Sequence, residues 1–235
     1  MLNIFDREIK LIGDEAFNKL KNSKVILFGL GGVGSYTFEA LIRSGIGRID
    51  VVDKDIVDET NINRQLIADI TTIGLKKVNC AKERGIKINP NCEINTFDIN
   101  YEVGDIRIDF KNYDYIIDAI DDVKAKIDII KRAKELGLPV ISCMGTGSKL
   151  ATNFKVSDIS KTSVCPLAKV IRKELKNLGI KDVKVIYSEE EPIKGLDKIG
   201  SISYVTGVAG LILSSEVIKD LIKWIYVSLD HQVLI

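Results

Sequence analysis

The chain of 235 residues has a single histidine, His231, near its C-terminal end. A serine–histidine–aspartate triad and a histidine-rich metal site are therefore close to excluded. Its four cysteines form no C-x-x-C pair, so a structural zinc site of the usual spacing is not expected. They are Cys80, Cys92, Cys143 and Cys165. Because no signal peptide is recognisable, we expect these cysteines to be reduced thiols of a cytoplasmic protein.

The chain also lacks a long apolar run and a strong net charge. Its most apolar stretch, residues 205–213, contains two glycines and is too short to cross a bilayer, so no membrane association is expected. The formal net charge is +1, which gives no global indication of nucleic-acid binding. The hydrophobic fraction of 46% is ordinary for a globular protein that buries its own core.

Four glycines follow the short apolar run 25–28 and precede a predicted helix; they are Gly29, Gly31, Gly32 and Gly34. Glycine lets the backbone approach a phosphate closely, and the N-terminus of a helix favours negative charge. Asp53 ends the next predicted strand, where a carboxylate can accept hydrogen bonds from ribose hydroxyls. The G-x-G-x-x-G spacing alone equally fits an NAD-binding domain.

Strands and helices alternate along the first two thirds of the chain. The expected strands are 24–29, 48–53, 92–97, 114–118 and 139–143, and the expected helices are 33–44, 75–88 and 123–136. This alternation predicts an α/β fold with a Rossmann-like, doubly wound and mostly parallel sheet. Ligands of such sheets bind beyond the carboxyl ends of the strands.

Three segments are expected around this pattern: an N-terminal helical arm (1–23), an ATP-binding Rossmann-like domain (24–147) and a C-terminal extension packed on the same domain (148–235). In the arm, Asp14 is expected to cap a short helix over 15–20, with residues 5–8 outside any core. The extension is expected to contain strands 152–157 and 182–187 and helices 165–178 and 207–227.

Polar residues gather at the expected strand ends. Arg64 and Lys77 could neutralise a triphosphate, and a carboxylate within 118–122 could hold Mg²⁺ together with substrate phosphates. This surplus of cations favours nucleotidyl transfer over NAD binding, because negative charge builds up at an attacked phosphate. Taken singly, Lys77 would be a surface residue, Asn61 a turn residue and Asp121 a helix cap.

A local excess of positive charge lies between Lys149 and Lys184, with nine lysines and arginines against three acidic residues. It includes Lys169, Arg172, Lys173 and Lys176 of the expected helix 165–178. A solvated helix face is the commoner explanation. The alternative is a surface for the phosphate backbone of a nucleic acid.

These motifs together resemble the ubiquitin-activating-enzyme-like adenylating superfamily. The resemblance rests on Gly29 to Gly34, Asp53, Lys77, Asp118-Ala119-Ile120-Asp121 and above all Thr60-Asn61-Ile62-Asn63-Arg64-Gln65. The segments 23–36, 158–168 and 200–205 are further similar to the branch of tRNA threonylcarbamoyladenosine dehydratases. That branch activates a threonyl carboxylate on tRNA with ATP, after which the neighbouring carbamoyl group closes a ring and AMP is released.

The resemblance implies a role for each matching residue. The four glycines, Asp53, Asp55, Asn61, Arg64 and Lys77 would bind the nucleotide, and Asp121 would hold Mg²⁺. Arg7 would reach into the active site of a partner subunit, so that the enzyme would be a homodimer with shared sites, catalysis depending on Arg7, Arg64, Lys77 and Asp121. Lys169, Arg172, Lys173 and Lys176 would bind the tRNA. A sulfur-transfer accessory protein remains open as a further partner.

Three alternatives remain beside this interpretation. Adenylation of the C-terminus of a ubiquitin-like sulfur carrier would keep the fold, but enzymes of that type commonly carry two C-x-x-C pairs, which this chain lacks. An NAD-dependent oxidoreductase is disfavoured by Arg64 and Lys77, and a non-catalytic scaffold by the intact ATP motif. Cys165 is expected to be a small buried or half-buried residue at a helix start rather than a nucleophile.

Overall fold

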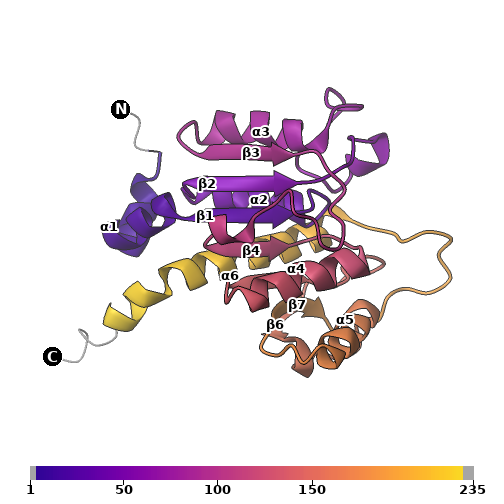
Figure 1. Cartoon of the computed structure of the whole chain (residues 1–235). Helices are drawn as coiled ribbons and strands as arrows, with labels where there is room; N and C mark the ends of the chain where they lie inside the picture. Colours follow the sequence, from indigo (N-terminus) through magenta and orange to yellow (C-terminus); the bar gives the residue numbers. More distant parts are fainter. Residues whose placement is uncertain (1–3, 230–235) are drawn as a thin grey trace.

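The computed structural model describes residues 4–229, with side chains from residue 4 to residue 222, so His231 lies outside the described residues. Seven strands form one sheet in the order β3-β2-β1-β4-β5-β7-β6 (Figure 1). All neighbours are parallel except β6 and β7. The strands are β1 (Lys24–Phe28), β2 (Arg48–Val52), β3 (Glu93–Phe97), β4 (Tyr115–Asp118), β5 (Val140–Cys143), β6 (Phe154–Asp158) and β7 (Lys184–Ser188). The predicted doubly wound α/β fold is confirmed.

The side chains of β1 show why the sheet is covered on both faces. Val25 and Leu27 belong to one hydrophobic cluster, whereas Ile26 and Phe28 belong to another. Successive side chains of a strand point to opposite faces, so a continuous apolar run fills two cores at once. This is the pattern that distinguishes a central parallel strand from a half-exposed one.

Six helices cover the two faces: α1 (Asp6–Asn22), α2 (Gly34–Arg43), α3 (Lys77–Ile88), α4 (Val123–Glu135), α5 (Pro166–Asn177) and α6 (Ser203–Leu229). The core cluster on one face takes its helical residues from α1, α2, α3 and α6. The cluster on the other face takes them from α4 and α5. Among the described residues, no helix is long and apolar enough to cross a membrane.

The N-terminal arm differs from the expectation of a short helix over 15–20. Helix α1 runs from Asp6 to Asn22 and is broken only at Gly13, whose φ is +82°. None of residues 5–8 belongs to a core cluster, as expected, although the ring of the half-buried Phe5 lies 5.1 Å from that of Phe17. The helix thus begins about nine residues before the expected start, with Asp6 and Glu8 in its first turn, where acidic side chains are favourable.

The C-terminal segment continues the sheet of the first 147 residues. β7 pairs with β5, and β6 pairs with β7, so the sheet grows by two strands from this segment. Helix α6 begins at Ser203 rather than at residue 207 and packs against α2. The division of the chain at residues 147 and 148 stays a prediction.

A buried ion pair joins β4 to α4. The Lys126 amine donates to Asp118 Oδ2 at 2.8 Å, to the Cys143 carbonyl at 3.0 Å and to Ser142 Oγ at 3.2 Å. Ser142 Oγ donates to the same Asp118 oxygen at 2.6 Å. Lys126 and Asp118 are both fully buried. The network therefore ties the carboxyl ends of β4 and β5 to the first turns of α4.

Removal of the Lys126 amine should be strongly destabilising. In Lys126→Ala, the Asp118 carboxylate stays buried without a counter-ion, and we expect a loss of about 3–5 kcal/mol of unfolding free energy. The matched control is Lys131→Ala on the same helix. Lys131 also forms an ion pair, with 3.8 Å between its Nζ and Glu135 Oε1, but both of these side chains are exposed. The control should change stability by under about 0.5 kcal/mol. Urea denaturation of both variants measures the difference, and equal midpoints would contradict it.

Candidate active site

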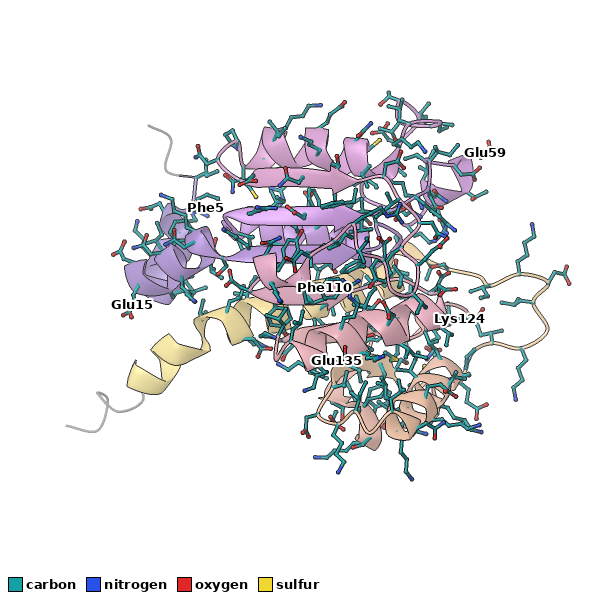
Figure 2. All side chains as sticks on the ribbon, viewed as in Figure 1. Phe5, Glu15, Glu59, Phe110, Lys124 and Glu135 are labelled. Carbon is teal, nitrogen blue, oxygen red and sulfur yellow. The ribbon has the colours of Figure 1, made fainter. Side chains whose placement is uncertain are left out.

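A cleft of about 760 Å³ opens beyond the carboxyl ends of the parallel strands. It lies where the strand order reverses between β1 and β4, the position at which doubly wound sheets bind ligands. Figure 2 shows the labelled Glu59 and Lys124 on the side toward which the strand arrows point, with Phe5 and Glu15 of the α1 region at the opposite end. Both the glycine-rich segment and the loop after Asp53 line this cleft.

The four glycines of the first turn have different roles. A Cβ on Gly34 would lie 1.9 Å from the Gly29 carbonyl oxygen, and a Cβ on Gly32 would lie 3.0 Å from the Thr206 side chain. Gly29 has a φ of +90°, which side-chain-bearing residues rarely adopt. Only at Gly31 would a Cβ meet open space. Gly29, Gly31 and Gly32 line the cleft, whereas Gly34 packs beneath the turn.

Asp53 fixes the turn and keeps capacity for a ligand. Its carboxylate accepts the Leu30 N–H at 2.7 Å and the Asp55 N–H at 2.8 Å. Burial raises the pKa of this carboxyl group, and the nearby charge of Lys77 opposes the rise. A carboxylate has about four acceptor positions, so lone pairs remain for ribose hydroxyls.

Lys77 is buried at the first residue of α3, which contradicts the simpler expectation of a surface lysine. Its amine donates to Asp55 Oδ2 at 2.8 Å, and both side chains line the cleft. Asp55 itself is exposed. The pair places one held cation beside the glycine turn, where the phosphates of a nucleotide would lie.

The loop after β2 is shaped by its own polar side chains. Asp58 accepts the Thr60 N–H at 2.8 Å, and Asn61 Oδ1 accepts the Asp58 N–H at 3.1 Å, so Asn61 does act as a turn residue. Asn61 also lines the cleft. Arg64 is half-buried at the cleft wall and donates to the Thr60 carbonyl at 2.7 Å. The loop therefore holds a guanidinium group at the cleft.

Asp121 is an exposed carboxylate at the cleft, in the turn after β4. It does not cap α4, because Asp122 does so by accepting the Ala125 N–H at 2.8 Å. The described residues contain no group of three His, Cys, Asp or Glu side chains suited to a metal ion. Mg²⁺ commonly takes one or two carboxylates together with substrate phosphates, and a free carboxylate on the nucleotide side of the cleft fits that mode.

The ThiF family model matches residues 5–234. The chain belongs to the ThiF family. It is 43% identical to a tRNA threonylcarbamoyladenosine dehydratase of Bacillus subtilis over 95% of this chain and 96% of that protein. It superposes on the Escherichia coli tRNA N6-threonylcarbamoyladenosine dehydratase solved in complex with ATP with a TM-score of 0.88, at 30% identity, over 94% of this chain and 95% of that one.

A relative with another name is also similar. The adenylyltransferase and sulfurtransferase UBA4 of Vanderwaltozyma polyspora is 36% identical over 58% of this chain and 31% of its own length. This similarity leaves out the remaining part of the chain, whereas the dehydratase matches extend over nearly all of it. The adenylating superfamily and the dehydratase branch inferred from the motifs are thus both supported.

Two residues of this ThiF-family cleft have no assigned role in the sequence analysis. Gln65 Oε1 is buried without a hydrogen-bond partner among the described residues, although Gln65 ends the Thr60–Gln65 motif. Lys149 is buried at the cleft, and burial lowers the pKa of its amine. Its position shortly after β5, at the carboxyl end of the sheet, is the signal that could have revealed it.

The basic residues of α5 fall into two groups. Lys169, Lys173 and Lys176 are exposed, and their spacing places them along one side of the helix. Arg172 is half-buried and donates at 2.6 Å to both the carbonyl and the hydroxyl oxygen of Thr162. Its guanidinium group is thus partly engaged within the protein. Cys165, at the start of α5, is buried and lines the cleft.

Two glycine variants should separate packing from ligand binding. Gly34→Ala should lose about 3 kcal/mol of stability, because its Cβ would overlap a backbone oxygen. Gly31→Ala should change stability by under about 0.5 kcal/mol but weaken ATP binding at least roughly tenfold, because the methyl group would keep phosphate from the backbone. Urea denaturation and calorimetric titration with ATP measure the two effects. Full ATP affinity in Gly31→Ala would remove the turn from the nucleotide site.

Proposed function

We propose that the chain is an ATP-dependent tRNA threonylcarbamoyladenosine dehydratase. It adenylates the threonyl carboxylate of the modified nucleoside and then converts it to the cyclic form, with AMP as the second leaving group. One observation carries the choice of tRNA as substrate: helix α5 lines the nucleotide cleft with its N-terminus and exposes Lys169, Lys173 and Lys176 along its length. A basic surface leading to the adenylation site is what a tRNA-borne carboxylate needs.

In the first step, a carboxylate oxygen attacks the α-phosphorus of ATP and the bond to pyrophosphate breaks. Negative charge builds up on the phosphoryl oxygens, and fixed cations that face them lower the barrier. The proposal assigns this work to Arg64 and Lys77, with the backbone around Gly31 against the phosphates and Asp53 on the ribose. Asp55 holds the Lys77 amine in place at 2.8 Å.

Asp121 is the residue that would hold Mg²⁺ in the loaded enzyme. The ion supplies positive charge to the phosphates of ATP during transfer. Asp121 lines the cleft and, unlike Asp118, is exposed, so its carboxylate is accessible to an ion that arrives with the nucleotide.

In the second step, the carbamoyl group of the same nucleoside attacks the acyl carbon. The bond from that carbon to the adenylate oxygen breaks, AMP leaves with the electron pair, and the carbamoyl group loses one proton. Both reacting groups belong to one molecule, so proximity replaces a protein nucleophile. Cys165 is buried at the N-terminus of α5 and needs no covalent role.

The active enzyme is proposed to be a homodimer that shares its sites. Arg7 is exposed on α1 and does not line the cleft of its own chain. Helices α1 and α6 pack together, and each exposes an apolar side chain, Leu11 at 81% and Leu211 at 51%. These exposed apolar side chains are available to a second copy, whose cleft Arg7 would have to reach if it acts in catalysis.

Two further parts of the proposal are the cellular compartment and a possible accessory protein. A tRNA substrate and four buried free cysteines accord with a cytoplasmic protein. A sulfur-transfer partner would find no exposed thiol among the described residues, and this partner stays a prediction.

Nucleoside mass analysis tests the proposed function directly. The protein is incubated with ATP, Mg²⁺ and tRNA that carries threonylcarbamoyladenosine, and the digested nucleosides are weighed. We expect the modified nucleoside to lose the mass of one water, only when ATP is present. Unchanged mass with a protein that still binds ATP would contradict the proposal and make a ubiquitin-like sulfur carrier the next substrate to test.

Mixed dimers test the shared site. Arg7→Ala and Lys77→Ala should each be inactive alone. When the two chains are co-expressed, about a quarter of the sites should be intact, because half of the dimers are mixed and each has one complete site. Turnover per site measures this recovery. Lys10→Ala on the same helix is the matched control and should keep full activity. Mixed dimers without activity would show that Arg7 is not supplied across the interface.

A further inference from the structure

Three lysines of the described chain are buried, and one of them differs from the other two. Lys77 pairs with Asp55 and Lys126 with Asp118, each at 2.8 Å. Lys149 is 3% exposed, yet no carboxylate of the described residues lies within 4.0 Å of its amine. The amine donates to the Ser188 carbonyl at 3.3 Å. A buried ammonium group with a single neutral acceptor is poorly compensated and favours the arrival of an anion.

The charge of Glu190 acts on Lys149, but its carboxylate is hydrogen-bonded to other groups. Its carboxylate accepts the Leu150 N–H at 3.1 Å and the Ala151 N–H at 2.8 Å. These contacts fix the segment that follows Lys149 without pairing the lysine itself. Glu190 therefore acts on Lys149 through its charge alone, and the amine has no carboxylate as a hydrogen-bond partner among the described residues.

The place of Lys149 in the sheet indicates which anion that is. The strand order places β5 and β7 on one side of β1 and β4, and β2 on the other. Asp53 follows β2 and the glycine turn follows β1, so a nucleotide bound there occupies the β2 side and the centre of the cleft. Lys149 follows β5 and is bonded to the last residue of β7, on the side that the nucleotide leaves free.

Helix α5 approaches the cleft from this same side. Cys165 and Pro166 at its N-terminus line the cleft together with Lys149. From that end, a row of exposed lysines runs along the helix: Lys169, Lys173 and Lys176. We call this row the basic stripe. A nucleic acid that follows the stripe would deliver its reacting nucleoside to the β5 and β7 side of the cleft.

We propose that Lys149 binds the threonyl carboxylate of the tRNA-borne nucleoside and holds it beside the α-phosphate of ATP. This inference rests on the proposed function. The ammonium group orients the attacking oxygen in the first step. Once that oxygen carries AMP, the carboxylate charge is gone, and the ammonium group then polarises the remaining acyl oxygen for attack by the carbamoyl group.

Binding of modified and unmodified tRNA tests the role of Lys149. The affinity of the protein is measured for the same tRNA with and without threonylcarbamoyladenosine, in the absence of ATP. A charge-assisted contact to the carboxylate should make wild type prefer the modified tRNA by roughly tenfold. Lys149→Met and Lys149→Gln should lose this preference while keeping the affinity for unmodified tRNA, and Lys149→Arg should restore part of it.

Lys173→Met is the matched control, because an exposed lysine of the stripe contacts phosphate in both tRNAs. It should weaken both affinities by the same factor and leave the preference unchanged. ATP affinity and the melting temperature establish that the Lys149 variants are folded. The role of Lys149 would be overturned if those variants still preferred modified over unmodified tRNA. It would also be overturned if wild type converted the nucleoside to its cyclic form but showed no such preference in binding. Absence of conversion by wild type would overturn the proposed function itself.

Discussion

The structure depends most on the buried contact between Lys126 and Asp118. Asp118 at the end of β4 and Lys126 on α4 are both removed from water, and their charges are tolerated because Ser142 and the Cys143 carbonyl complete their hydrogen bonds. The contact fixes the turn that carries Asp121 and the start of the segment that leads to Lys149. Two loops that line the cleft are thus held by one network whose charged groups, Asp118 and Lys126, do not line the cleft themselves.

The cleft combines positively charged side chains that are fixed by hydrogen bonds with carboxylates that are exposed to solvent. Lys77 is oriented by Asp55 and Arg64 by the Thr60 carbonyl, so both cations are positioned before a nucleotide arrives. Such preorganisation is the main way in which proteins stabilise charge that develops on a phosphate. The glycine turn contributes in the same sense, because Gly29 and Gly34 are required by close backbone contacts that hold Gly31 open to the cleft.

Much of this arrangement could be predicted from the sequence, because the order of apolar and polar residues within a short segment largely determines whether it forms a strand, a helix or a turn. Alternating apolar runs and helix starts gave the sheet and its helices within a few residues, and the Thr60–Gln65 motif indicated the adenylating family. Contacts between distant residues could not be predicted in this way. The sequence did not predict the start of α1 at Asp6. Asp122 rather than Asp121 caps α4, and the burial of Lys126 and Lys149 follows only from the three-dimensional packing.

The same reasoning explains how one adenylating fold can serve different carboxylates. In the proposed function, activation uses the side of the cleft formed after β1, β2 and β4, and the chemistry of adenylation is the same for a carrier protein and for tRNA. In this proposal, substrate choice falls to the opposite side, formed after β5 and β7 and by α5. In this chain that side presents a basic stripe outside and a buried ammonium group inside. A small acid attached to a polyanion matches both, whereas a protein C-terminus would use only the buried group.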